Sequence, residues 1–158
     1  MNEIDTITSF HTNIGKFWLN FGSLELMLRL VLHRRKGEDT RDPQLLRPLR
    51  VGEQLTENAI NNYDSFREVC NKFNATLKAS EKIDFSRIEK FRNAIAHGRT
   101  VGDGINLTIT KFSKSNNKSV KVEFSWTYSA QELTDLIEFL GELTRRISVD
   151  HLGATISS

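Results

Sequence analysis

The chain has 158 residues, of which 22 are lysine or arginine and 20 are aspartate or glutamate, so its formal net charge is +2. A hydrophobic fraction of 38% and a charged fraction of 27% exclude a disordered chain. This length fits one compact domain over residues 1–158, and the near balance of charges permits a nucleic-acid partner without requiring one.

The residue types also limit the sites and the location of the protein. A single cysteine, Cys70, excludes an internal disulfide, and with only four histidines the chain has no ligand set for a cysteine-rich zinc site. The N-terminal residues are acidic where a signal peptide would be basic. The longest apolar stretch, residues 24–32, is interrupted by Glu25 and Arg29. We therefore expect a cytoplasmic protein that spans no membrane and needs no metal or cofactor.

The first predicted element is a long helix over about residues 5–35, with Gly37 close to its end. Its apolar residues recur at steps of three and four, which places them in one stripe along a helix. The stripe consists of Phe10, Ile14, Phe17, Phe21, Leu24, Leu28 and Val31. Pro43 and Pro48 then break regular helix within a connector over residues 34–53.

Two more helices are predicted before the periodicity changes. Apolar residues keep helical spacing over about residues 54–78, and Cys70 lies on their stripe, which indicates a core position. A third helix is predicted over about residues 84–97. Ser86 and Glu89 have the spacing of a capping box, and Gly98 is typical of the residue after a helix.

The next segment has the alternation of a β-hairpin over about residues 104–128. Apolar and polar residues alternate on both sides of a polar turn sequence, SKSNNKS. The alternating apolar residues are Ile105, Leu107 and Ile109 before the turn, and Val120, Val122, Phe124, Trp126 and Tyr128 after it. A lone hairpin is marginal in water, so its apolar face must pack on helices or on another chain.

A fourth helix is predicted to begin after Ser129, which forms a second capping box with Glu132, and to run through Ile147. Residues 151–158 are expected to be a frayed tail. The sequence therefore predicts a mainly α fold, a four-helix, bundle-like domain with one β-hairpin inserted between the third and fourth helices.

The residues that best fit chemistry lie at the end of the third helix, in the segment RNAIAHGR over residues 92–99. Asn93 and His97 are four residues apart, so their side chains are neighbours on a helix. A histidine that transfers protons, placed beside an arginine and an amide, suits phosphodiester chemistry. The arginine stabilises the extra charge on phosphorus, and the amide orients the reacting groups. The alternative from spacing alone is a surface arginine and a capping histidine.

Arg92-Asn93-Ala94-Ile95-Ala96-His97 resembles the RNxxxH signature of the HEPN superfamily, and the helical frame of most of the chain is similar too. The resemblance implies a metal-independent endoribonuclease. Two protomers would form a homodimer in which both motifs face one groove. His97 would act on the 2′-hydroxyl or the leaving 5′-oxygen, Arg92 would bind the scissile phosphate, and Asn93 would hold the geometry.

The resemblance also implies products and partners. Cleavage of the RNA substrate would leave a 2′,3′-cyclic phosphate and a 5′-hydroxyl. The usual settings are toxin–antitoxin pairs, abortive infection and other anti-phage defence, so an antitoxin or regulatory protein is an expected partner. Some toxins of the superfamily carry a tyrosine two residues after the histidine, which the antitoxin modifies with AMP. This chain has Arg99 there, which puts that form of neutralisation in doubt.

Two further residues are assigned supporting roles, each with an alternative. Arg99 supplies a second phosphate contact, or is a solvated loop arginine. Glu25 pairs with Arg92 and orients it, or makes an i,i+4 contact with Arg29. The alternative function is a catalytically silent RNA-binding or dimerisation module. A buried His97 bonded to a backbone carbonyl would contradict the enzyme.

Overall fold

A computed structural model of the chain describes residues 3–37, 48, 50–103, 105–114 and 119–153. The chain divides into two compact units, one made of residues 1–20 and 84–140 and the other of residues 21–83 and 141–158. Two long helices, α1 (Glu3–Arg35) and α5 (Ala130–Leu152), contribute residues to both units. No helix in the described part of the chain has an apolar run long enough to cross a bilayer.

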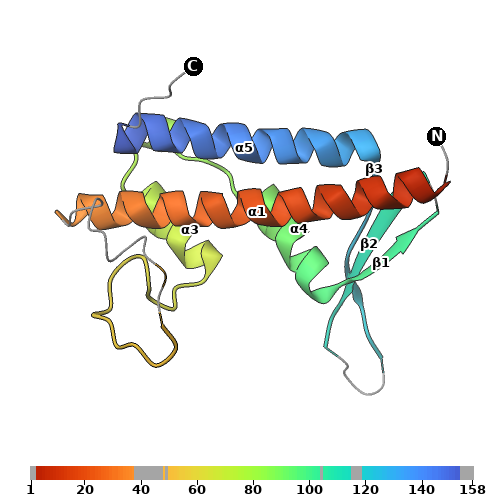
Figure 1. Cartoon of the computed structure of the whole chain (residues 1–158), viewed down its shortest axis with the longest axis horizontal. Coiled ribbons are helices and arrows are strands. Elements are labelled where there is room, and N and C mark those ends of the chain that lie inside the picture. Colours follow the sequence, from red (N-terminus) through yellow and green to blue (C-terminus); the bar gives the residue numbers. More distant parts are fainter. Residues whose placement is uncertain (1–2, 38–47, 49, 104, 115–118, 154–158) are drawn as a thin grey trace. The chain divides into compact units, whose positions relative to one another are not determined.

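The first unit combines helices with a sheet. α4 (Ser86–His97) leads into β1 (Arg99–Gly102), and β2 (Asn106–Phe112) and β3 (Val122–Ser129) follow before α5 begins (Figure 1). Among the described residues the strands form one antiparallel, three-stranded sheet in the order β1-β2-β3. The register pairs Ile109 with Trp126 and Leu107 with Tyr128.

The predicted fold class is wrong in one respect that matters for the site. A mainly helical, bundle-like domain with a single hairpin is not what forms, because a third strand, β1, pairs with β2 and makes the fold mixed α/β. The hairpin itself has the predicted alternation, since Ile109 and Tyr128 are buried on the same face. β1 brings the residue after the motif, Gly98, directly to the sheet.

The capping predictions had different outcomes. At the start of α5, the amide of Ser129 donates to Glu132 Oε2 at 2.8 Å and the amide of Glu132 donates to Ser129 Oγ at 3.2 Å, which confirms that capping box. α4 has no such box, because its cap position is Phe85 and the Ser86 amide donates to Asp84 Oδ1 at 2.9 Å instead.

The second unit contains α3 (Phe66–Ala75) and the short 3-10 helix η1 (Ala79–Glu81) in addition to its parts of α1 and α5. Phe21 packs on Phe66 with ring centroids 4.7 Å apart, and Phe73 packs on the His151 ring at 5.4 Å. Cys70 is buried, as its place on the apolar stripe indicates. α5 continues to Leu152, two residues into the predicted frayed tail, whose residues 154–158 lie outside the described part.

The predicted helix over residues 54–78 is wrong for its first half. Residues 50–64 form turns and irregular chain, and the helix begins only at Phe66. The buried guanidinium of Arg29 holds part of this segment, since Nη1 donates to Asn62 Oδ1 at 2.7 Å and Nη2 donates to the Asp64 carbonyl at 2.7 Å. Most of the predicted connector, at 38–47 and 49, lies outside the described residues.

Candidate active site

The motif is positioned by the buried face of α4. Ile88, Phe91 and Ala94 are buried at steps of three, so this face packs into the first unit. The Phe91 ring contacts Phe17 of α1 at 4.6 Å and Tyr128 of β3 at 4.9 Å, both edge to face. The aromatic contacts fix α4, and the side chains of 92, 93 and 97 are left on its other faces.

Gly98 follows the last residue of α4, at a position where a larger residue has no space. Its amide donates to the Ala94 carbonyl at 2.6 Å, and its backbone is extended (φ −93°, ψ −177°), so glycine is not required by a left-handed conformation. A Cβ at this position would lie 2.3 Å from the Ala94 carbonyl oxygen and 2.8 Å from that of Thr110. The glycine therefore lets the end of α4 approach β2 closely.

Arg92 and Asn93 are brought together. Arg92 Nη1 donates to Asn93 Oδ1 at 2.9 Å, and both side chains are half-buried. The sequence predicts a different neighbour for Asn93, the His97 side chain one turn on. In the structure the side-chain oxygen of Asn93 accepts a hydrogen bond from the Arg92 guanidinium.

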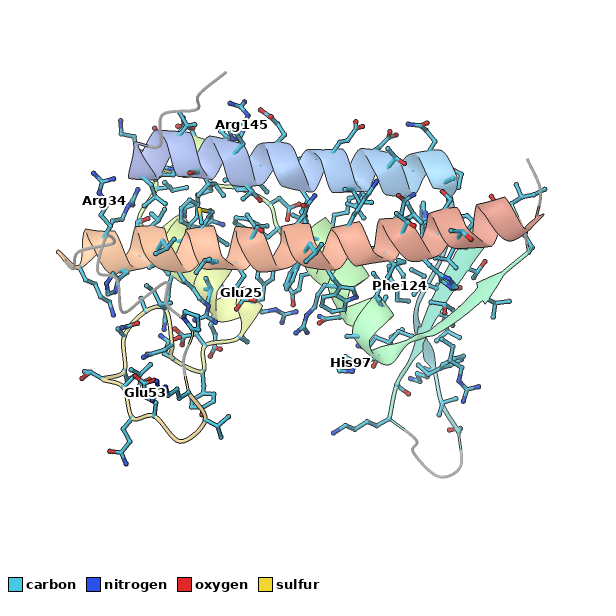
Figure 2. All side chains as sticks on the ribbon, viewed as in Figure 1. Glu25, Arg34, Glu53, His97, Phe124 and Arg145 are labelled. Atoms are coloured by element: carbon cyan, nitrogen blue, oxygen red, sulfur yellow. The ribbon has the colours of Figure 1, made fainter. Side chains whose placement is uncertain are left out.

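His97 occupies the last turn of α4 and is exposed. In Figure 2 it lies at the end of α4 and points away from the helix. Within the described residues its ring makes no hydrogen bond to another side chain or to a carbonyl. The burial that would contradict an enzyme is therefore not found, and the imidazole is accessible to a substrate.

Arg99 and Glu25 each contact a side chain outside the motif. The Arg99 guanidinium stacks over the Phe112 ring at 5.6 Å from its centroid, which sequence reasoning missed. Alternation in β2 is a sequence signal for the face on which Phe112 lies, whereas the pairing of β1 that brings Arg99 to this face is seen only in the structure. Glu25 Oε1 accepts from Arg29 Nη2 at 2.8 Å and from Nε at 3.0 Å, which is the i,i+4 contact left open by the sequence. A role of Glu25 in orienting Arg92 stays a prediction.

A cavity of about 450 Å³ adjoins the motif within the first unit. α1 supplies Phe10, His11 and Ile14, α4 supplies Ile95, and the segment from Gly98 into the sheet supplies Gly98, Thr100, Gly102 and Leu107. Its walls are largely apolar. No group of three or more histidine, cysteine, aspartate or glutamate side chains suited to a metal ion occurs among the described residues.

The chain was compared with models of protein families, with curated proteins and with solved structures, and none of the three comparisons gives a match.

Proposed function

We propose that the protein is a metal-independent endoribonuclease that uses Arg92, Asn93 and His97. The observation that carries the proposal is the placement of these residues on one helix. His97 is exposed in the last turn of α4, and Arg92 is held by Asn93 Oδ1 on the same helix. Together they offer a proton-transfer group and a fixed cation to one phosphodiester.

The reaction is an attack by the RNA on its own backbone. His97 takes the proton from a ribose 2′-hydroxyl, and the 2′-oxygen forms a bond to the adjacent phosphorus. The bond from phosphorus to the 5′-oxygen then breaks. The leaving oxygen receives a proton, which gives a 5′-hydroxyl and a 2′,3′-cyclic phosphate. These steps need no metal, because the histidine moves the protons and the arginine supplies the positive charge.

Arg92 stabilises the charge that grows on the phosphoryl oxygens. Its planar guanidinium presents several donors at fixed angles, which suits two oxygens of one phosphate. The bond to Asn93 reduces the rotamers that the guanidinium samples before RNA binds. A charged donor that is already positioned lowers the energy of the transition state more than a donor that must first reorganise.

The motif supplies one histidine per chain, His97, which suits a shared site in a homodimer. One imidazole must accept a proton while another donates one, so His97 from each of two copies would complete the acid–base pair. In this proposal the protein acts in the cytoplasm as a toxin or an anti-phage effector. An antitoxin or regulatory protein would keep the RNA away from His97 until cleavage is needed.

The test is cleavage of a labelled single-stranded RNA by the wild type and by His97→Ala, Arg92→Ala and Lys90→Ala. Lys90 is an exposed cation on the same helix and serves as the matched control. We expect the first two variants to lose cleavage and the third to keep it. Equal activity in all four proteins would contradict the site, and RNA binding without cleavage by the wild type would indicate a silent RNA-binding module.

A further inference from the structure

The two faces of the three-stranded sheet differ sharply in chemistry. One face carries the buried Ile109 and Tyr128. The other carries a ladder of hydroxyl groups, in which Thr108 Oγ1 lies 2.8 Å from Thr127 Oγ1. The next rung, between Thr110 Oγ1 and Ser125 Oγ, spans 3.2 Å. Both rungs are exposed.

A stacked cation and aromatic ring extend this exposed face. β1 pairs Arg99 with Thr110, so the arginine stands on the same face as the hydroxyl ladder. From there it stacks over Phe112, whose side chain is 36% exposed. We call the surface formed by the ladder, Arg99 and Phe112 the hydroxyl face.

The charges around the hydroxyl face favour an anionic partner. Of the two acidic side chains among the described residues 99–129, Glu123 pairs with Lys111 at 2.8 Å, whereas Asp103 accepts from the amides of Ile105 and Asn106 and keeps its negative charge. Arg99, Lys114 and Lys121 are exposed. The surface therefore offers positive charge and hydroxyl groups, with an aromatic ring among them.

We propose that the hydroxyl face is the docking surface for single-stranded RNA. A base stacks on Phe112, the Arg99 guanidinium contacts a phosphate of the backbone, and the hydroxyl ladder exchanges hydrogen bonds with ribose and phosphate oxygens. Stacking does not discriminate between bases, and the cationic side chains contact the phosphates of the RNA backbone. Only Gly98 separates Arg99 from His97, so RNA held at Arg99 reaches the end of α4. The proposal rests on the proposed function and names the surface that presents its substrate.

The experiment measures binding separately from cleavage. Its probe is a short fluorescent single-stranded RNA with 2′-O-methyl groups, which lacks the attacking hydroxyl and stays intact, and the readout is fluorescence anisotropy at several salt concentrations. We expect Phe112→Ala to weaken binding about tenfold. Arg99→Gln should reduce the slope of log K against log salt by about 0.7, the value for one phosphate contact on a single strand.

A pair of charge insertions tests which face of the sheet is used. Thr127→Glu places a carboxylate on the hydroxyl face, whereas Trp126→Glu places one on the opposite face, because Trp126 pairs with Ile109. Both side chains are exposed, and thermal unfolding of each variant checks that it folds. We expect Thr127→Glu to weaken binding and Trp126→Glu to bind as the wild type does. The reverse pattern, or wild-type affinity in Thr127→Glu and Phe112→Ala, overturns the proposal.

Failure of this surface and failure of the proposed function give different results. If the wild type cleaves unmodified RNA while every variant of the hydroxyl face binds and cleaves normally, the surface is wrong and the nuclease stands. If the probe binds and the variants weaken it, but unmodified RNA is never cut, the surface stands and the nuclease is wrong.

Discussion

The α-carbon of Gly98 lies so close to the carbonyl oxygen of Thr110 that a Cβ there would come within 2.8 Å of it. This contact joins the end of α4 to the middle of the sheet. His97 precedes the glycine and Arg99 follows it, so the close approach determines where the candidate catalytic residue stands relative to the hydroxyl face.

Gly98→Ala is expected to destabilise the protein by about 1–3 kcal/mol, because the three nearest atoms that the new methyl group meets all belong to the backbone. The matched control is Gly15→Ala in α1, where a Cβ meets no atom within 4 Å. That change should raise stability by about 0.5–1 kcal/mol. Urea unfolding measures both. A Gly98→Ala variant as stable as the wild type would show that α4 and β2 can move apart without loss of stability.

Asn93→Ala is expected to slow cleavage about tenfold to a hundredfold while leaving the fold intact, because it removes the acceptor that holds Arg92 Nη1. Single-turnover rates under saturating RNA measure the effect. A positioning role predicts a lower rate with little change in RNA affinity. An unchanged rate, or a loss confined to affinity, would contradict it.

Tyr128 makes stability depend on alkaline pH. Burial, with the nearby Glu132 carboxylate adding and Arg87 opposing, raises the pKa of Tyr128 to about 12, from an ordinary value of 10.0. The folded state therefore favours the neutral phenol. Its contribution to stability is fully present below pH 10 and is lost as the pH rises from about 10 towards 12.

Tyr128→Phe should remove that part of the pH dependence, because phenylalanine keeps the ring against Phe91 and has no proton to lose. The measurement is the denaturant midpoint of the wild type and the variant at several pH values from neutral to alkaline. If the two proteins lose stability in parallel across this range, burial does not raise the pKa of Tyr128.

Arg29→Ala is expected to destabilise the second unit by roughly 2–4 kcal/mol, since it leaves the buried carbonyl of Ala59 and the half-buried oxygens of Asn62 and Asp64 without their donor. Lys16→Ala, at an exposed position of the same helix, is the control and should have little effect. Thermal unfolding compares them. Because the candidate site lies in the first unit, RNA cleavage at a temperature where Arg29→Ala is folded should match the wild type.

The long-range periodicity of the sequence predicts most of the helices and the hairpin. The stripe in α1 and the alternation in β2 and β3 extend over enough residues to be distinctive. β1 was missed because RTVG is short, has one large apolar residue and directly follows a helix. Its pairing with β2 depends on the close approach at Gly98, which no local pattern reports.

The errors in the second helix have a local cause. Leu55 and Tyr63 continue the helical spacing, but both are exposed, and Tyr63 is wholly so. A capping pattern at Ser65 and Glu68 marks the true start: the Glu68 amide donates to Ser65 Oγ and the Ser65 amide donates to Glu68 Oε2. At the site, spacing predicts that Asn93 and His97 are neighbours on α4, but it could not show that Arg92 takes the Asn93 oxygen.

The most direct test of the account is the chemistry of the RNA ends produced by purified protein in excess EDTA. We predict that the wild type cuts single-stranded RNA and leaves 2′,3′-cyclic phosphates and 5′-hydroxyls, and that His97→Ala, which folds normally, leaves the RNA intact. Cleavage that persists in His97→Ala, or products ending in 5′-phosphates, would contradict the account.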